Sequence, residues 1–190
     1  MKHVSYLMLG ILSYFTFFSV KAQDKFFDPL LDPECKASFP ELMETWNSTY
    51  MWYPGLLSAH KQKIQKEKSD NRCVNVDYPG NFMKDYNRTI FRKKIKLAED
   101  TEIRWNAVGK VSFSVDDREI NNNLKVYKLS SGTHFLKFDV MTENRLPALI
   151  VQGEGIQDLE GWQVSLDNQS WNLPETDIRY NKPSIAPDDS

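Results

Sequence analysis

Much of this chain alternates apolar and polar side chains with a period of two residues. The clearest case runs from Thr89 to Leu97, where Phe91, Ile95 and Leu97 share one face and charged residues fill most other positions. Alternation of this kind predicts an antiparallel strand with one buried face. Similar segments follow as far as residue 166, bounded by turn-forming residues. They are residues 101–108, 110–115, 118–120, 124–127, 134–141, 148–152 and 162–166.

The part of the chain before these strands has a mixed pattern. Residues 45–53 alternate aromatic and polar side chains, which predicts one further strand. The next segment, residues 56–68, predicts a short helix because Leu57, His60 and Ile64 fall on one helical face with charged residues elsewhere.

The N-terminus has the pattern of a secretory signal. Lys2 and His3 precede an apolar run over residues 6–20, and Val20-Lys21-Ala22 offers small residues at both key positions of a cleavage site. The run is shorter than the roughly 20 apolar residues that a membrane span needs. We therefore expect cleavage of a signal peptide and export to the periplasm or the extracellular space. An uncleaved N-terminal anchor is the alternative.

Many short strands at regular spacing, with one short helix, predict an all-β fold. We expect an antiparallel β-sandwich of the jelly-roll or galactose-binding-like type, which follows the cleaved signal peptide. The expected organisation is a signal peptide (1–22), a lead-in segment (23–44), the sandwich domain (45–172), and an exit linker or truncated tail (173–190). Prolines break up both the lead-in and the tail.

The charge balance argues against nucleic acid as a partner. The whole chain has 24 basic and 26 acidic residues, a net charge of −2, and removal of Lys2 and Lys21 with the signal makes it −4. A mildly acidic domain does not attract phosphate backbones by its overall field. The lysine-rich stretch 61–68 lacks interleaved aromatic residues, so we interpret it as the solvated face of the helix.

Two cysteines, Cys35 and Cys73, remain after signal cleavage. Export permits a disulfide between them, which would stabilise the fold by about 3–4 kcal/mol in the chain-entropy model. Two unbridged thiols are the alternative. Two isolated cysteines without paired histidines nearby do not form a zinc site, so we expect no metal and no cofactor.

Catalytic candidates are weak. Three pairs of nearby carboxylates occur: Asp116 with Asp117, Glu154 with Asp158, and Asp188 with Asp189. Hydrolysis of a glycoside needs two carboxyl groups that face each other across the substrate, one of them with a raised pKa. We interpret Asp116-Asp117 as a hairpin turn. The sequence has no Gly-x-Ser-x-Gly nucleophile elbow for which His60 or His134 could act as the general base. The sequence thus predicts no catalytic residue.

Carbohydrate binding is chemically plausible. Sugar rings stack on Trp and Tyr, and their hydroxyl groups need polar partners. The candidate residues are Trp46, Asn47, Tyr53, Trp171 and Asn172. The alternative is that these aromatic residues lie in the core or in a seam against a neighbouring domain. We favour the core for Trp52 and Trp105, and both alternatives stay open for Trp46, Tyr53 and Trp171.

The order of several short motifs resembles one family. The motifs are Trp46–Gly55, Lys61–Lys68, Tyr78-Pro79, Phe91–Lys93, Val111–Ile120, Ser131–Leu136, Leu146–Glu154, Trp162 and Trp171. In their order and spacing they resemble the N-terminal region of α-L-rhamnosidase-like glycoside hydrolases, over roughly residues 45–185. That resemblance implies a β-sandwich that precedes an (α/α)6 catalytic barrel, whose acidic pair performs inverting hydrolysis.

This chain has no room for such a barrel, so no catalytic residue can be transferred to it. The expected function is a non-catalytic accessory module, a truncated gene product that supports a catalytic domain or binds carbohydrate during polysaccharide degradation. The expected partners are a carbohydrate and the barrel or a neighbouring polypeptide, with no nucleic acid and no membrane span after signal cleavage. The alternatives are a free-standing secreted carbohydrate-binding protein and a structural or protein-interaction β-sandwich.

Overall fold

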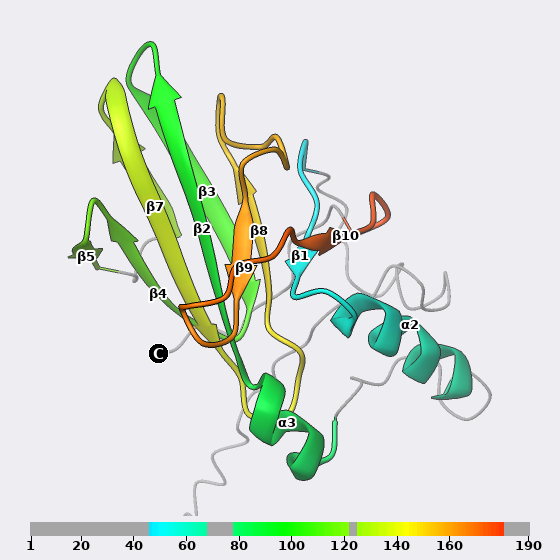
Figure 1. Cartoon of the computed structure of the whole chain (residues 1–190). Coiled ribbons are helices and arrows are strands. Elements are labelled where there is room, and N and C mark those ends of the chain that lie inside the picture. The colour runs from blue at the N-terminus through cyan, green and yellow to red at the C-terminus, as the bar shows by residue number, and fades with distance from the viewer. Residues whose placement is uncertain (1–45, 68–77, 122–124, 181–190) are drawn as a thin grey trace, which may run out of the picture.

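The computed structural model describes residues 46–67, 78–121 and 125–180. Within these residues the chain forms two antiparallel five-stranded sheets and two helices (Figure 1). The helices are α2 (Leu56–Glu67) and α3 (Gly80–Tyr86). The strands are β1 (Met51–Trp52), β2 (Arg88–Leu97), β3 (Thr101–Val108), β4 (Lys110–Val115), β5 (Arg118–Ile120), β6 (Val126–Leu129), β7 (Gly132–Met141), β8 (Ala148–Gln152), β9 (Gln163–Ser165) and β10 (Glu175–Thr176).

The two sheets have the strand orders β10-β1-β8-β3-β6 and β5-β4-β7-β2-β9. The longest pairing joins β2 to β7, from Arg88 opposite Met141 to Leu97 opposite Gly132. In Figure 1 the sheet of β7, β2 and β9 lies in front of the sheet that contains β3 and β8. The prediction of an all-β antiparallel sandwich is therefore confirmed.

The core fills the space between the sheets, as the alternation in β2 and β7 predicts. Phe91, Phe113 and Phe138 are fully buried, and the rings of Phe113 and Phe138 stack with centroids 4.3 Å apart. Trp105 packs on Phe113 at 4.8 Å. Each such side chain contributes about 1.5–3 kcal/mol by leaving water, so this aromatic cluster stabilises the contact between the two sheets.

A second apolar cluster lies where β1, α2 and the end of the described chain meet. It contains Trp46, Trp52 and Tyr180, and Tyr180 packs edge-on against Trp52 at 5.0 Å. Trp52 and Trp105 are 1% and 2% exposed. The prediction that both tryptophans belong to the core is confirmed.

The predicted strand over residues 45–53 is too long. Among its described residues, strand geometry occurs in Met51 and Trp52. The residues before them make a different set of contacts: the amide of Tyr50 donates to the carbonyl of Tyr180 at 2.7 Å, and Thr49 Oγ1 donates to the same carbonyl at 2.8 Å. The aromatic spacing thus reflects burial in the second cluster and not an extended ladder.

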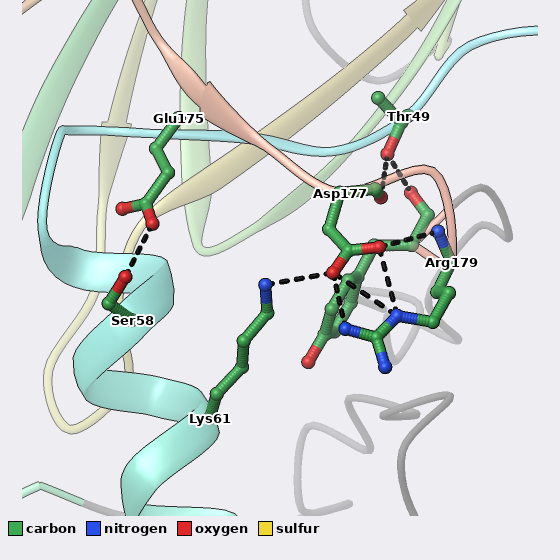
Figure 2. Close-up of polar contacts among 7 residues, drawn as sticks. Thr49, Ser58, Lys61, Glu175, Asp177 and Arg179 are labelled. Carbon is green, nitrogen blue, oxygen red and sulfur yellow. Dashed lines mark hydrogen bonds and ion pairs between the residues drawn. The ribbon is translucent and has the colours of Figure 1, made fainter.

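The sandwich continues beyond the expected boundary at residue 172. β10 pairs with β1, and Glu175 accepts hydrogen bonds from the Gly55 amide at 2.8 Å and from Ser58 Oγ at 2.7 Å. These two contacts tie the carboxylate to the start of α2. Figure 2 shows the hydrogen bond between Ser58 and Glu175. Residues 173–180 are therefore part of the fold and not a linker.

A cluster of charged groups fixes the same segment to α2 (Figure 2). Asp177 lies 2.8 Å from Lys61 Nζ and accepts from Arg179 through Nη2 at 2.6 Å and Nε at 3.0 Å. Thr49 Oγ1 donates to the carbonyl of Asp177 at 2.5 Å. The hydrogen bonds from Arg179, and then Lys61, hold the pKa of Asp177 well below its ordinary value.

One helix was expected and the described residues contain two. The predicted helix over 56–68 corresponds to α2, whereas α3 is an addition. Pro79 and Gly80 resemble a turn, but Pro79 is the N-cap residue of α3, and its carbonyl accepts from the amides of Phe82 and Met83 at 3.0 Å. Phe82 and Tyr86, four residues apart, pack at 5.0 Å along α3. Within the described residues, no helix is long and apolar enough to cross a membrane.

Several predictions lie outside the described residues. They are the signal peptide 1–22, the lead-in 23–44, the disulfide candidates Cys35 and Cys73, and the acidic pair Asp188 and Asp189.

Candidate carbohydrate-binding surface

The five predicted sugar-binding residues occupy different places in the fold. Trp46 is 9% exposed and packs in the second apolar cluster, so its ring is not available as a stacking platform. Asn47, next to it, is exposed in a bend. For Trp46 the structure therefore agrees with the core alternative.

Tyr53 and Asn172 meet at the edge of the sandwich where the two sheets come together. Asn172 Nδ2 donates to Tyr53 Oη at 3.4 Å, a long hydrogen bond. Asn172 also forms an isolated bridge with Val164 of β9, while Tyr53 directly follows β1 of the other sheet and packs against both apolar clusters. This pair joins the two sheets.

Trp171 lies on the other side of the same strand-like segment. Since Asn172 pairs with the core-facing Val164, the preceding side chain points away from the core. There the guanidinium carbon of Arg92 lies 3.4 Å from the centre of the Trp171 ring, and Arg92 Nε donates to Gln163 Oε1 at 2.9 Å. One ring face of Trp171 is thus occupied by Arg92.

These contacts define a surface cluster of Trp171, Arg92 and Gln163. Burial lowers the pKa of Arg92, yet a guanidinium stays charged at neutral pH because its ordinary pKa exceeds 12. The cluster therefore combines an aromatic ring, a held cation and an amide. These are the groups that orient a sugar ring and its hydroxyl groups.

Three carboxyl groups of the described residues have a clearly shifted pKa, and none of the three fits a general acid. The hydrogen bond from His134 lowers the pKa of Asp116, and backbone amides of Ser170 and Gln169 lower the pKa of Asp167 to about 2. With Asp177, every clearly shifted carboxyl group shifts downward. A glycosidase acid needs the opposite shift.

Asp116 and Asp117 form the turn between β4 and β5, with φ values of 51° and 63°. Left-handed backbone at two successive positions is the geometry of a tight hairpin turn, which Asp tolerates. Asp116 accepts from the Phe135 amide at 2.8 Å and contacts His134 Nδ1 at 2.8 Å. The interpretation of this acidic pair as a hairpin turn is confirmed.

Residues 89–178 match the family described as "Alpha-rhamnosidase-like, bacteroidetes, N-terminal". The resemblance to this family is confirmed. The matched segment runs from the second residue of β2 through β10 and so covers most strands of both sheets. The chain finds no match among curated proteins.

Two solved structures are similar to this chain at low sequence identity. One is a lectin from Pleurotus ostreatus in complex with GalNAc, with 12% identity and a TM-score of 0.43, over 72% of this chain and 46% of the lectin. The other is an α-L-rhamnosidase from Streptomyces avermitilis complexed with L-rhamnose, with 13% identity and a TM-score of 0.46, over 77% of this chain and 17% of that enzyme. The chain thus spans less than half the length of either protein.

Arg92 and Gln163 are the two residues of the cluster that the sequence did not single out. Alternation places Arg92 on the polar face of its strand, where lysines surround it. Its special position comes from pairing with Gln163, 71 residues later, and from the ring of Trp171. The sequence around Arg92 does not indicate these contacts, because any long polar side chain fits this position of the strand.

Proposed function

We propose that this chain is a non-catalytic N-terminal accessory module of an α-L-rhamnosidase-like glycoside hydrolase. The observation that carries this proposal is the family match over residues 89–178, which covers nearly all of the sandwich. The pKa values of Asp116, Asp167 and Asp177 are shifted downward, so these three groups do not fit the role of a carboxylic acid that stays protonated near neutral pH.

The module helps to hold carbohydrate at the cluster of Trp171, Arg92 and Gln163. Its partner is the catalytic domain of the parent family, either on a longer chain or on a neighbouring polypeptide. Export to the periplasm or the extracellular space places the module where polysaccharide is degraded.

The test is a pair of measurements on the purified chain. Calorimetry with rhamnose-bearing oligosaccharides should give binding heat that Trp171→Ala removes and that Lys128→Ala, an exposed change on β6 of the other sheet, leaves intact. A chromogenic rhamnoside should not be cleaved. Steady hydrolysis by the purified chain would disprove the non-catalytic role, and no heat with millimolar oligosaccharide would disprove the binding role.

A protein-interaction role is the second candidate, and one observation favours it. Leu173 and Ile178 are each 75% exposed and flank β10. A contiguous exposed apolar patch marks a contact surface, and this role requires that both side chains belong to one such patch. This role predicts that Leu173→Asp with Ile178→Asp weakens association with the separately expressed catalytic domain, and that oligosaccharides give no heat. The converse pair of results would support carbohydrate binding.

A further inference from the structure

The side of the β5-β4-β7-β2-β9 sheet that points away from the core, termed the outer face, carries a continuous polar row. Arg92 of β2 stands opposite Lys137 of β7 and opposite Gln163 of β9, and Lys137 stands opposite Ser114 of β4. Directly paired residues share one face of a sheet. The row therefore crosses four strands, which Figure 1 shows side by side, and Trp171 lies against Arg92 at one end.

Positive charge is concentrated on this outer face. By register, its basic residues are Arg88, Arg92, Lys94, Lys96, Lys110 and Lys137, and its acidic residues are Glu119 and Asp139. Asp139 is neutralised by Arg88, whose Nε and Nη2 donate to it at 2.9 Å and 2.5 Å. Glu119 lies on the edge strand β5. The chain as a whole has a net charge of −2, so this face, with more basic than acidic residues, has the opposite sign.

The pairing at the centre of the outer face costs stability. Arg92 and Lys137 are like charges placed directly opposite each other, an arrangement that destabilises an antiparallel pair. Lys94, two residues along β2 from Arg92, adds a third cation on the same face. Across the three described stretches, the side chains of Lys94 and Lys137 have no hydrogen-bond or ion-pair partner. Local conflicts of this kind are expected where a ligand compensates them.

Arg92 is held ready for a planar anion. Its Nε donates to Gln163 and its guanidinium carbon lies 3.4 Å from the centre of the Trp171 ring, while within the described chain its two Nη groups make no hydrogen bond. A guanidinium fixed in this way loses little freedom when it binds a carboxylate through two N–H groups. An aromatic ring next to that carboxylate site suits the apolar face of a sugar.

We propose that the outer face binds an acidic saccharide, with a uronate carboxylate between Arg92 and Lys137 and the sugar ring beside Trp171. This inference rests on the proposed carbohydrate-binding function and adds the charge of the ligand to it. Lys94 extends the same positive surface along β2, so a chain with several carboxylates binds more tightly than a single uronate.

Calorimetry at low salt with a galacturonate oligosaccharide and its methyl ester tests the charge directly, because esterification removes each carboxylate charge and adds only a methyl group. The acid should bind at least tenfold more tightly than the ester, and its affinity should fall as salt is raised. Lys137→Gln should weaken binding of the acid about tenfold and leave binding of the ester unchanged, and Arg92→Gln should weaken binding of the acid by at least as much. Lys128→Gln, on the opposite sheet, is the matched control.

Lys137→Gln carries a second readout that separates ligand binding from misfolding. Since this change removes a like-charge pair, the melting temperature of the ligand-free protein should stay the same or rise while acid binding weakens. A fall in melting temperature together with the loss of binding would overturn the role assigned to Lys137.

The outcomes distinguish this inference from the proposed function. Equal affinity for acid and ester, with heat that Trp171→Ala abolishes, overturns the acidic-ligand inference and leaves carbohydrate binding standing. Heat from neither ligand and none from neutral rhamnose-bearing oligosaccharides overturns both. Equally tight binding of a single-stranded oligonucleotide of matched charge also overturns the inference, because the outer face would then bind polyanions without regard to sugar.

Discussion

Substitution of Asp177 by Asn tests whether residues 173–180 stabilise the sandwich. The carboxylate is 13% exposed at its side chain and receives hydrogen bonds from Arg179 and an ion pair from Lys61. A hydrogen bond to a charged group contributes about 1.5–3 kcal/mol, and the exposure of Arg179 reduces its share. We therefore expect Asp177→Asn to lower the free energy of unfolding by about 2 kcal/mol, or the melting temperature by about 4–8 °C.

The pH dependence of this effect has a definite sign. The partners of Asp177 lower its pKa in the folded state, so its contribution is complete above the unfolded pKa of about 3.9. It is lost as pH falls from that value through the folded pKa. The difference in melting temperature between the natural protein and Asp177→Asn should accordingly be constant near neutral pH and shrink below about pH 4.

Thermal unfolding followed by circular dichroism, with Asp85→Asn as control, measures both effects. Asp85 is an exposed acid on α3, so its neutralisation should leave the melting temperature within about 1 °C. A double-mutant cycle with Lys61→Met should give a coupling energy of at least about 0.5 kcal/mol. An unchanged melting temperature for Asp177→Asn, or strict additivity with Lys61→Met, would refute the idea that this cluster fixes the C-terminal segment to α2.

Three further predictions concern other parts of the sandwich. Gly109→Ala should lower the yield of folded protein and its melting temperature, because φ is +127° and a Cβ would clash with the Met141 carbonyl oxygen. Gly80→Ala should change neither, because a Cβ there meets open space. Lys93→Met should destabilise by about 2 kcal/mol in denaturant titration, because Lys93 Nζ donates to the carbonyls of Ile156 and Asp158 at 3.2 Å and 2.6 Å. His134→Gln should lower the melting temperature more at pH 5.5 than at pH 8.5. The contact with Asp116 raises the pKa of His134. The contribution of His134 to stability is therefore complete below about pH 6.5 and is lost as pH rises through the folded pKa. Equal effects at both pH values would exclude that coupling.

The strands were predictable because the alternation of apolar and polar residues within each strand shows which side chains are buried. Phe91, Ile95 and Leu97 alternate with solvated lysines, and all three lie in the core between the sheets. Alternation does not predict burial correctly where a charged side chain is buried. Lys93 shares the core-facing side of β2 and is 6% exposed, because carbonyls of residues 156 and 158 satisfy its ammonium group. Those carbonyls come from a segment that no pattern within β2 could indicate.

The C-terminal segment was misjudged for a related reason. Its prolines and polar residues are typical of a linker when no partner is known. Glu175 and Asp177 nevertheless contact α2 and the segment before β1, more than 110 residues earlier in the chain. Contacts of this kind leave no periodic signal in the sequence, because the two contacting segments are far apart along the chain.

The same limit explains why the predicted sugar-binding residues did not form one site. Proximity in sequence placed Trp171 beside Asn172, but neighbours in an extended segment point to opposite sides, and here they reach Arg92 and Tyr53 respectively. What joins Trp171 to a binding surface is the register of β2, β7 and β9, which brings Arg92, Lys137 and Gln163 into one row. Register depends on how whole strands pair. A ligand that binds this row therefore contacts residues that only the assembled sheet brings together. A peptide of a single strand should accordingly bind no saccharide.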